Sequence, residues 1–133
     1  MTLFIDTGAW MALSYRRDDH HAEAVRFAER EFANARLVTS EAVLGETISL
    51  MRFRIGHAAA LGFIDSLADI PADIVFTDAS LHSDALGIFR KAGEQSFSYV
   101  DCLSFAIMRN RGIREAFAFD ADFARFGFVS RPE

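Results

Sequence analysis

Two apolar runs of strand length in this chain each lead into an aspartate. The run over residues 3–5 leads into Asp6, and the run over residues 117–119 leads into Asp120. In an α/β fold, ligands bind at the carboxyl ends of parallel strands, so two such ends bring acids that are distant in sequence to one edge of the sheet. The two runs therefore predict a metal site at that edge.

Strand-like runs alternate with helical patterns along the whole chain. We expect strands at 3–6, 37–39, 74–76 and 116–119, with an edge strand at 128–129, and helices at 8–15, 20–34, 40–54, 57–67, 79–91, 98–111 and 121–126. Asp18 or Asp19 is the expected N-cap of the second helix, while Gly56, Gly93 and Gly112 are expected stop signals. This alternation predicts a mostly parallel sheet of four to five strands with helices on both faces.

The size and composition of the chain predict one domain. With 133 residues and 51% hydrophobic content, the chain has ample material for a single core. Asp6 interrupts the first apolar run before it reaches the length of a signal peptide, and no later run approaches a bilayer span. Because Cys102 is the single cysteine and has no metal-binding spacing, we expect a small core residue in a cytoplasmic protein.

The net charge of −5 argues against binding of nucleic acid through general basicity. Of the 14 basic residues, however, only Lys91 is a lysine, and arginines are suited to bidentate contacts with phosphates. A cation held by several carboxylates would also make the working charge less negative than the formal one. A nucleic-acid substrate is therefore compatible with the composition.

Each acid also has an ordinary structural explanation. Asp6 could occupy a turn or cap a helix, and either Asp120 or Asp122 could cap the short helix that follows them. Asp101 follows Ser98 by three residues, which is the spacing of a capping box. These explanations remain open from the sequence alone.

Glu46 and Asp101 lie on apolar faces of their expected helices. A glutamate is rarely buried without a partner, so Glu46 could instead form a salt bridge with Arg52 or be partly exposed. Carboxylates that lie close together repel one another unless a cation neutralises them. A shared site for Asp6, Glu46, Asp101 and Asp120 would select a hard cation, magnesium or manganese, because all of its ligands are oxygens.

Four motifs in the chain have an order and spacing that resemble the PIN domain, and most closely the VapC toxins of bacterial toxin-antitoxin systems. They are Asp6-Thr7-Gly8, Glu46 early in a helix after Val38-Thr39-Ser40, Ser98-Tyr99-Val100-Asp101, and Ala118-Phe119-Asp120-Ala121-Asp122-Phe123 followed by Gly127-Phe128. The resemblance covers essentially the whole chain. It implies a PIN-like three-layer sandwich in one domain, residues 1–133.

The resemblance further implies a magnesium- or manganese-dependent ribonuclease that acts on RNA and leaves 5′-phosphate and 3′-hydroxyl ends. Its acidic residues would be Asp6, Glu46, Asp101 and Asp120, with Thr7, Ser98 and Asp122 at the periphery of the site. Ala118 departs from the family, which often has Thr or Ser two residues before the fourth acid. Candidates for contacts with the RNA backbone are Arg16, Arg17, Arg109, Arg111 and Arg114, although for any one of them a solvated surface position is the simpler explanation.

Two other functions fit parts of the sequence. A receiver domain of a signalling system would use Asp78 as its phosphorylated residue, but it also needs an acidic pair after the first strand and a lysine that ends the last. A PIN scaffold used only for binding is a further alternative, although all four acids are present. The cluster Asp18-Asp19-His20-His21 is best explained as a solvated helix start, because adjacent helical residues do not face one another.

The helix expected over residues 40–54 carries a second apolar stripe, which continues into the next helix. Its residues are Leu44, Ile48, Met51, Ile55, Ala60, Leu61 and Ile64. This stripe could be buried within the domain, or it could form a homodimer interface or bind a VapB-like antitoxin, as the family resemblance implies.

Overall fold

A single five-stranded sheet organises the chain. The computed structural model describes residues 1–133, and its strands are β1 (Thr2–Ile5), β2 (Arg36–Ser40), β3 (Ala72–Val75), β4 (Glu115–Phe117) and β5 (Val129–Arg131). The strand order is β3-β2-β1-β4-β5, and every neighbouring pair is parallel. The expected mostly parallel sheet is thus confirmed, with no antiparallel strand.

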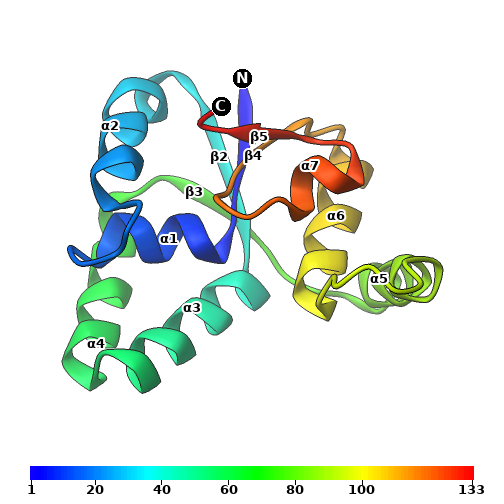
Figure 1. Ribbon diagram of the computed structural model, residues 1–133, viewed down its shortest axis with the longest axis horizontal. Coiled ribbons are helices and arrows are strands. Elements are labelled where there is room, and N and C mark those ends of the chain that lie inside the picture. Colours follow the sequence, from blue (N-terminus) through cyan, green and yellow to red (C-terminus); the bar gives the residue numbers. More distant parts are fainter.

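Helices cover both faces of the sheet and form a three-layer sandwich. They are α1 (Thr7–Ser14), α2 (His21–Glu31), α3 (Glu41–Arg54), α4 (His57–Ser66), α5 (Ala79–Lys91), α6 (Tyr99–Arg111) and α7 (Asp122–Phe126), with short 3₁₀ helices at Phe32–Asn34 and Leu67–Asp69. Helices α1 to α4 lie on one side of the sheet and α5 to α7 on the other (Figure 1). None of these helices is both long and apolar enough to span a bilayer.

The strand order reverses its direction between β1 and β4. The chain moves outward from β1 to β2 and β3, then crosses back over the sheet to β4 and continues to β5. Right-handed crossovers place the connecting helices of the two directions on opposite faces. The carboxyl ends of β1 and β4 therefore flank a topological switch point, where open α/β sheets form their ligand sites.

Local signals in the sequence position the helices that lead to this edge. The Ser40 hydroxyl accepts a hydrogen bond from the Val43 N–H at 3.0 Å and caps α3, and Gly56 ends that helix region with a φ of 148°. Gly112 ends α6 with a φ of 66°, which L-residues with side chains rarely adopt. The predicted boundaries of α3, α5 and α6 are confirmed to within one residue.

Three sequence predictions about element boundaries are wrong. Neither Asp18 nor Asp19 is the N-cap of α2; that position is His20, whose N–H donates to Asp18 Oδ1 at 2.8 Å in the preceding turn. Strand β3 begins and ends earlier than expected, and Phe76 lies beyond it with 70% exposure. Strand β4 ends at Phe117, so Asp120 follows it at a distance of three residues instead of ending it.

The core accounts for only part of the second apolar stripe. Leu44, Met51 and Ala60 are buried within the domain. Ile55, Leu61 and Ile64 are instead exposed by 37%, 46% and 42%, and they lie on α4 and just beyond the end of α3. Burial within the fold therefore explains the inner half of the stripe and leaves an apolar outer face.

Candidate metal centre

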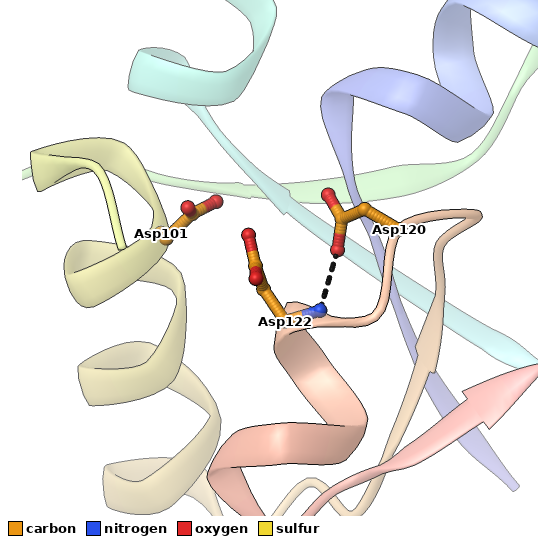
Figure 2. Close-up of side chains that lie close together, drawn as sticks. All are labelled: Asp101, Asp120 and Asp122. Carbon is orange, nitrogen blue, oxygen red and sulfur yellow. Dashed lines mark hydrogen bonds between the residues drawn. The ribbon is translucent and has the colours of Figure 1, made fainter. Parts of the chain in front are cut away.

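Three aspartates converge beyond the carboxyl ends of β1 and β4. Each of Asp101, Asp120 and Asp122 offers a carboxylate oxygen, and these three atoms lie within 4.8 Å of one another. Asp101 comes from the first turn of α6, Asp120 from the loop after β4, and Asp122 from the first residue of α7. Figure 2 shows the three carboxylates pointing into a shared space. Asp122, expected at the periphery, lies within this group.

Two of these aspartates also hold the backbone in place. Asp101 and Ser98 form the predicted capping box, in which Asp101 Oδ2 accepts from the Ser98 N–H and the Asp101 N–H donates to the Ser98 hydroxyl, both at 3.0 Å. Asp120 Oδ1 accepts from the Asp122 N–H at 3.0 Å (Figure 2). In each case the carboxylate has a second oxygen available for the shared space.

Asp6 is the most deeply buried acid of the site. It occupies the N-cap position of α1, yet its side chain caps nothing, so the capping explanation for this residue is wrong. The side chain is 4% exposed, and none of the six ion pairs in the structure includes it. Burial, followed by the negative charge of Asp120, raises the pKa of Asp6 to about 8, and the charges of Asp101 and Glu46 act in the same direction.

Burial and neighbouring negative charges also raise the pKa values of Asp101 and Asp120. Burial raises the pKa of Asp101 to about 6, and the charges of Asp120 and Asp122 contribute to the increase. The pKa of Asp120 is raised by burial and by the charges of Asp122 and Glu46, while Arg125 partly offsets them. Arg125 also pairs with Asp122 at 3.2 Å. These mutual effects show that five acids, Asp6, Glu46, Asp101, Asp120 and Asp122, share one electrostatic environment.

Glu46 reaches this environment from α3, where it is half-buried. Of the two alternatives for Glu46, the salt bridge with Arg52 is wrong, because no ion pair of the structure includes Glu46 and Arg52 contacts His57 Nδ1, whereas the partly exposed position is observed. The charge of Glu46 raises the pKa values of Asp6 and Asp120, so Glu46 belongs to the same electrostatic group. The structure therefore brings the four predicted acids close enough for their charges to interact, but of these four only Asp101 and Asp120 belong to the group whose oxygens lie within 4.8 Å of one another.

A buried polar network below Asp6 was not predicted as part of the site. Thr39, in β2, donates its hydroxyl to the Ile5 carbonyl at 3.0 Å and accepts from the Trp10 indole N–H at 3.2 Å. These bonds fix the residue before Asp6 and the helix after it. The sequence signal was the single tryptophan, since a buried indole N–H needs an acceptor.

The chemistry of these residues fits a divalent cation. Carboxylate oxygens converge without a lysine or arginine that neutralises Asp6, and mutual repulsion of this kind is relieved by a bound cation. Thr7 supports this fit, because its hydroxyl oxygen is buried and has no hydrogen-bond partner within the protein. An all-oxygen ligand set favours a hard cation over zinc.

The five arginines considered for RNA contacts lie in different places. Arg16 and Arg17 line a hollow of about 480 Å³ beyond the carboxyl end of α1. The Arg109 guanidinium lies over the Phe126 ring at 5.0 Å. Arg111 lines a hollow beside the first residues of β1 and β2, and Arg114 directly precedes β4. The last two therefore lie at the edge of the parallel sheet that is opposite the acids.

Fold and site together define an α/β domain with a cluster of carboxylates at its topological switch point. The PIN domain family matches residues 3–129, and the chain belongs to this family. The receiver-domain alternative is therefore wrong, and Asp78 instead caps α5 by accepting from the Leu81 N–H at 2.8 Å.

The chain is similar to proteins named as VapC nucleases. It is 38% identical to the 23S rRNA-specific endonuclease VapC20 of Mycobacterium tuberculosis, over 98% of this chain and 99% of the relative. It is 28% identical to a VapC ribonuclease of Archaeoglobus fulgidus, over 78% of this chain and 68% of the relative. The crystal structure of M. tuberculosis VapC20, described as a toxin that cleaves the sarcin-ricin loop, superposes with a TM-score of 0.89 at 36% identity, over 96% of each chain.

A more distant structure shares the fold. It is that of VapBC2 from Rickettsia felis bound to a promoter DNA fragment, with a TM-score of 0.77 and 12% identity over 98% of each chain. At this identity the likeness concerns the fold alone.

Proposed function

We propose that this protein is a metal-dependent endoribonuclease, the toxin of a VapBC-type toxin-antitoxin pair. The observation that carries the proposal is the convergence of Asp101, Asp120 and Asp122 at the switch point of a PIN-family sheet, where their charges act on Asp6, a buried carboxylate without a basic partner. The 38% identity to a 23S rRNA-specific endonuclease makes 23S ribosomal RNA the first substrate to test. Hydrolysis of a phosphodiester bond is the corresponding reaction.

The proposed cofactor is Mg²⁺ or Mn²⁺, held by Asp6, Asp101 and Asp120 with Glu46 beside them. The bound cation would supply positive charge to the phosphate oxygens and lower the pKa of a water, so that water can attack in line. The protein residues have complementary tasks. Asp101 and Asp120 are oriented through their backbone hydrogen bonds, and the buried hydroxyl of Thr7 can order a water near Asp6.

Attack by water, in place of the RNA 2′-hydroxyl, gives 5′-phosphate and 3′-hydroxyl products. Inducible expression followed by sequencing of new RNA 5′ ends tests the proposal directly. We expect discrete new ends with the wild type and none with Asp6→Asn, which retains the side-chain shape and removes a charge that the cation needs. New ends that are equally abundant with Asp6→Asn would refute the site. A complete lack of new ends with a folded, metal-loaded wild type would favour a PIN scaffold used only for binding.

We also propose that the chain forms a homodimer through the apolar outer face of Ile55, Leu61 and Ile64, and that it binds a VapB-like antitoxin. Exposed apolar side chains next to one another are typical of interaction surfaces. Action on cellular RNA would take place in the cytoplasm. Sedimentation at increasing concentration should show a dimer that Leu61→Asp dissociates. A wild type that remains monomeric would assign the face to the antitoxin or leave it solvated.

A further inference from the structure

The hollow beyond the end of α1 is lined by three arginines and an aromatic residue. Its six lining residues are Ser14, Tyr15, Arg16, Arg17, Arg54 and Ile55, and its volume is about 480 Å³. The first four belong to the end of α1 and the turn after it, while Arg54 is the last residue of α3 and Ile55 follows it. The end of α3 and the turn after α1 thus bring three arginines to one concave surface.

No acid neutralises these arginines. The six ion pairs of the structure involve Arg30, Arg36, Arg125, Arg131 and His20, and no carboxylate lines the hollow. In a protein with a net charge of −5, a concave surface with three guanidinium groups and no acid is a local positive site. Such a surface attracts anions.

Helices α1 and α3 connect the hollow to the acidic centre. Asp6 directly precedes α1, and Arg16 and Arg17 follow its last residue, so the eight residues of α1 separate the two sites by about 12 Å of helix. Along α3, Glu46 and Arg54 are eight residues apart, which again corresponds to about 12 Å. Both helices therefore connect the acids to the arginines, and Figure 1 shows them running alongside each other away from the sheet.

We propose that this hollow, with Arg54 as an additional basic member, binds a backbone phosphate of the RNA strand a few nucleotides from the cleaved bond. The proposal rests on the proposed ribonuclease function and extends it to a second contact. An acidic catalytic centre repels a polyanion, so the strand needs cationic contacts beyond the cation at the centre. Guanidinium groups provide paired donors for phosphate oxygens.

An RNA strand fits this hollow better than an acidic protein segment. Tyr15 lies among the arginines and offers a ring on which a base can stack, and the combination of basic and aromatic side chains is typical of single-strand binding. The volume also suits a nucleotide-sized group, whereas a single carboxylate needs much less space. The position of the hollow also favours RNA, because a strand that leaves the acidic centre can follow α1 and α3.

The test measures binding separately from cleavage. Labelled, mixed-sequence single-stranded RNA is titrated with wild-type protein in EDTA, which prevents metal-dependent hydrolysis, over a series of salt concentrations. Each lost phosphate contact should reduce the magnitude of the slope of log affinity against log salt by about 0.7. We expect this reduction, with weaker binding, for Arg54→Gln and for Arg17→Gln.

Arg90→Gln is the matched control. Arg90 is exposed near the end of α5, a helix on the opposite side of the sheet from α1 and α3 (Figure 1), and the substitution removes the same charge. An RNA affinity and salt slope for Arg54→Gln that equal those of Arg90→Gln would overturn the proposal. The proposal also fails if Arg54→Gln lowers only the thermal midpoint, because that result would assign Arg54 to stabilisation of the α3 carboxyl end.

Two further results separate the alternatives. Binding of a labelled polyglutamate peptide that depends on Arg54, together with RNA binding that does not, would assign the hollow to an acidic protein segment and overturn the proposal. If the wild type cleaves no RNA in magnesium but loses RNA affinity on Arg54→Gln in EDTA, the ribonuclease function fails while the phosphate site stands.

Discussion

Replacement of Asp6 by asparagine should make the metal-free protein more stable, although it removes activity. Burial, together with the charge of Asp120, raises the pKa of this carboxyl from 3.8 to about 8 in the folded protein. Between these two values the folded state holds a proton that the unfolded state has released. Stability of the wild type therefore falls as the pH rises through this range, by about 1.4 kcal/mol per pH unit.

The size of this loss of stability follows from the difference between the working pH and the unfolded-state pKa of Asp6. About three pH units separate the unfolded pKa from neutral pH, so the proton that only the folded state retains on Asp6 costs the wild type about 4 kcal/mol at pH 7 and about 2 kcal/mol at pH 5. The side chain is only 4% exposed, so solvent screening does not reduce these values substantially. Asparagine does not titrate. The stability advantage of Asp6→Asn should therefore grow with pH and become constant above the folded-state pKa.

Urea unfolding in EDTA at several pH values measures the difference in unfolding free energy between the wild type and Asp6→Asn. Glu29→Gln is the control, since Glu29 is exposed on α2 and takes part in no ion pair of the structure. We expect the control to follow the wild type at every pH. A gap between wild type and Asp6→Asn that is independent of pH, or that shrinks as the pH rises, would refute the conclusion that Asp6 is buried without a charge partner.

Three other perturbations examine the same centre. Millimolar Mg²⁺ or Mn²⁺ should stabilise the wild type by about 1 to 3 kcal/mol in thermal unfolding, and selective stabilisation by zinc would contradict an all-oxygen site. Asp120→Ala should abolish cleavage. Asp122→Ala should retain measurable cleavage with weaker metal affinity, because the Asp122 carboxylate already pairs with Arg125. If a manganese titration shows the reverse order of activities, Asp122 is the essential acid. Thr39→Val should cost about 1 to 3 kcal/mol in urea unfolding because it leaves the Trp10 indole N–H without its acceptor, and an unchanged midpoint would refute that role.

The sequence was most informative where structure depends on near neighbours. The hydroxyl of Ser40, the capping box of Ser98 and Asp101, and the glycine at position 112 act within a few residues, and they define α3 and α6. Capping signals of this kind can be recognised from spacing alone. The boundaries of the two helices that carry Glu46 and Asp101 were therefore predicted to within one residue.

Strand ends depend on pairing with other strands, which the local pattern does not contain. The apolar run through Ala118 and Phe119 suggested that β4 reaches Asp120, but the ladder with β1 and β5 ends at Phe117. The additional residues turn the chain so that both Asp120 and Asp122 face Asp101. A sequence pattern that places Asp120 at the end of the strand gives no reason to include Asp122, and this is why the latter was expected at the periphery.

The structural and the chemical explanations of these acids are compatible, because a carboxylate has two oxygens. Asp101 uses one oxygen to accept from the Ser98 N–H, and Asp120 uses one to accept from the Asp122 N–H. These bonds hold each carboxylate in a fixed direction and leave the second oxygen for the shared space. Asp6 differs, because it caps no helix and forms no ion pair. A cation at this centre would therefore meet two acids already oriented by the backbone and one, Asp6, whose buried charge has no basic side chain to neutralise it.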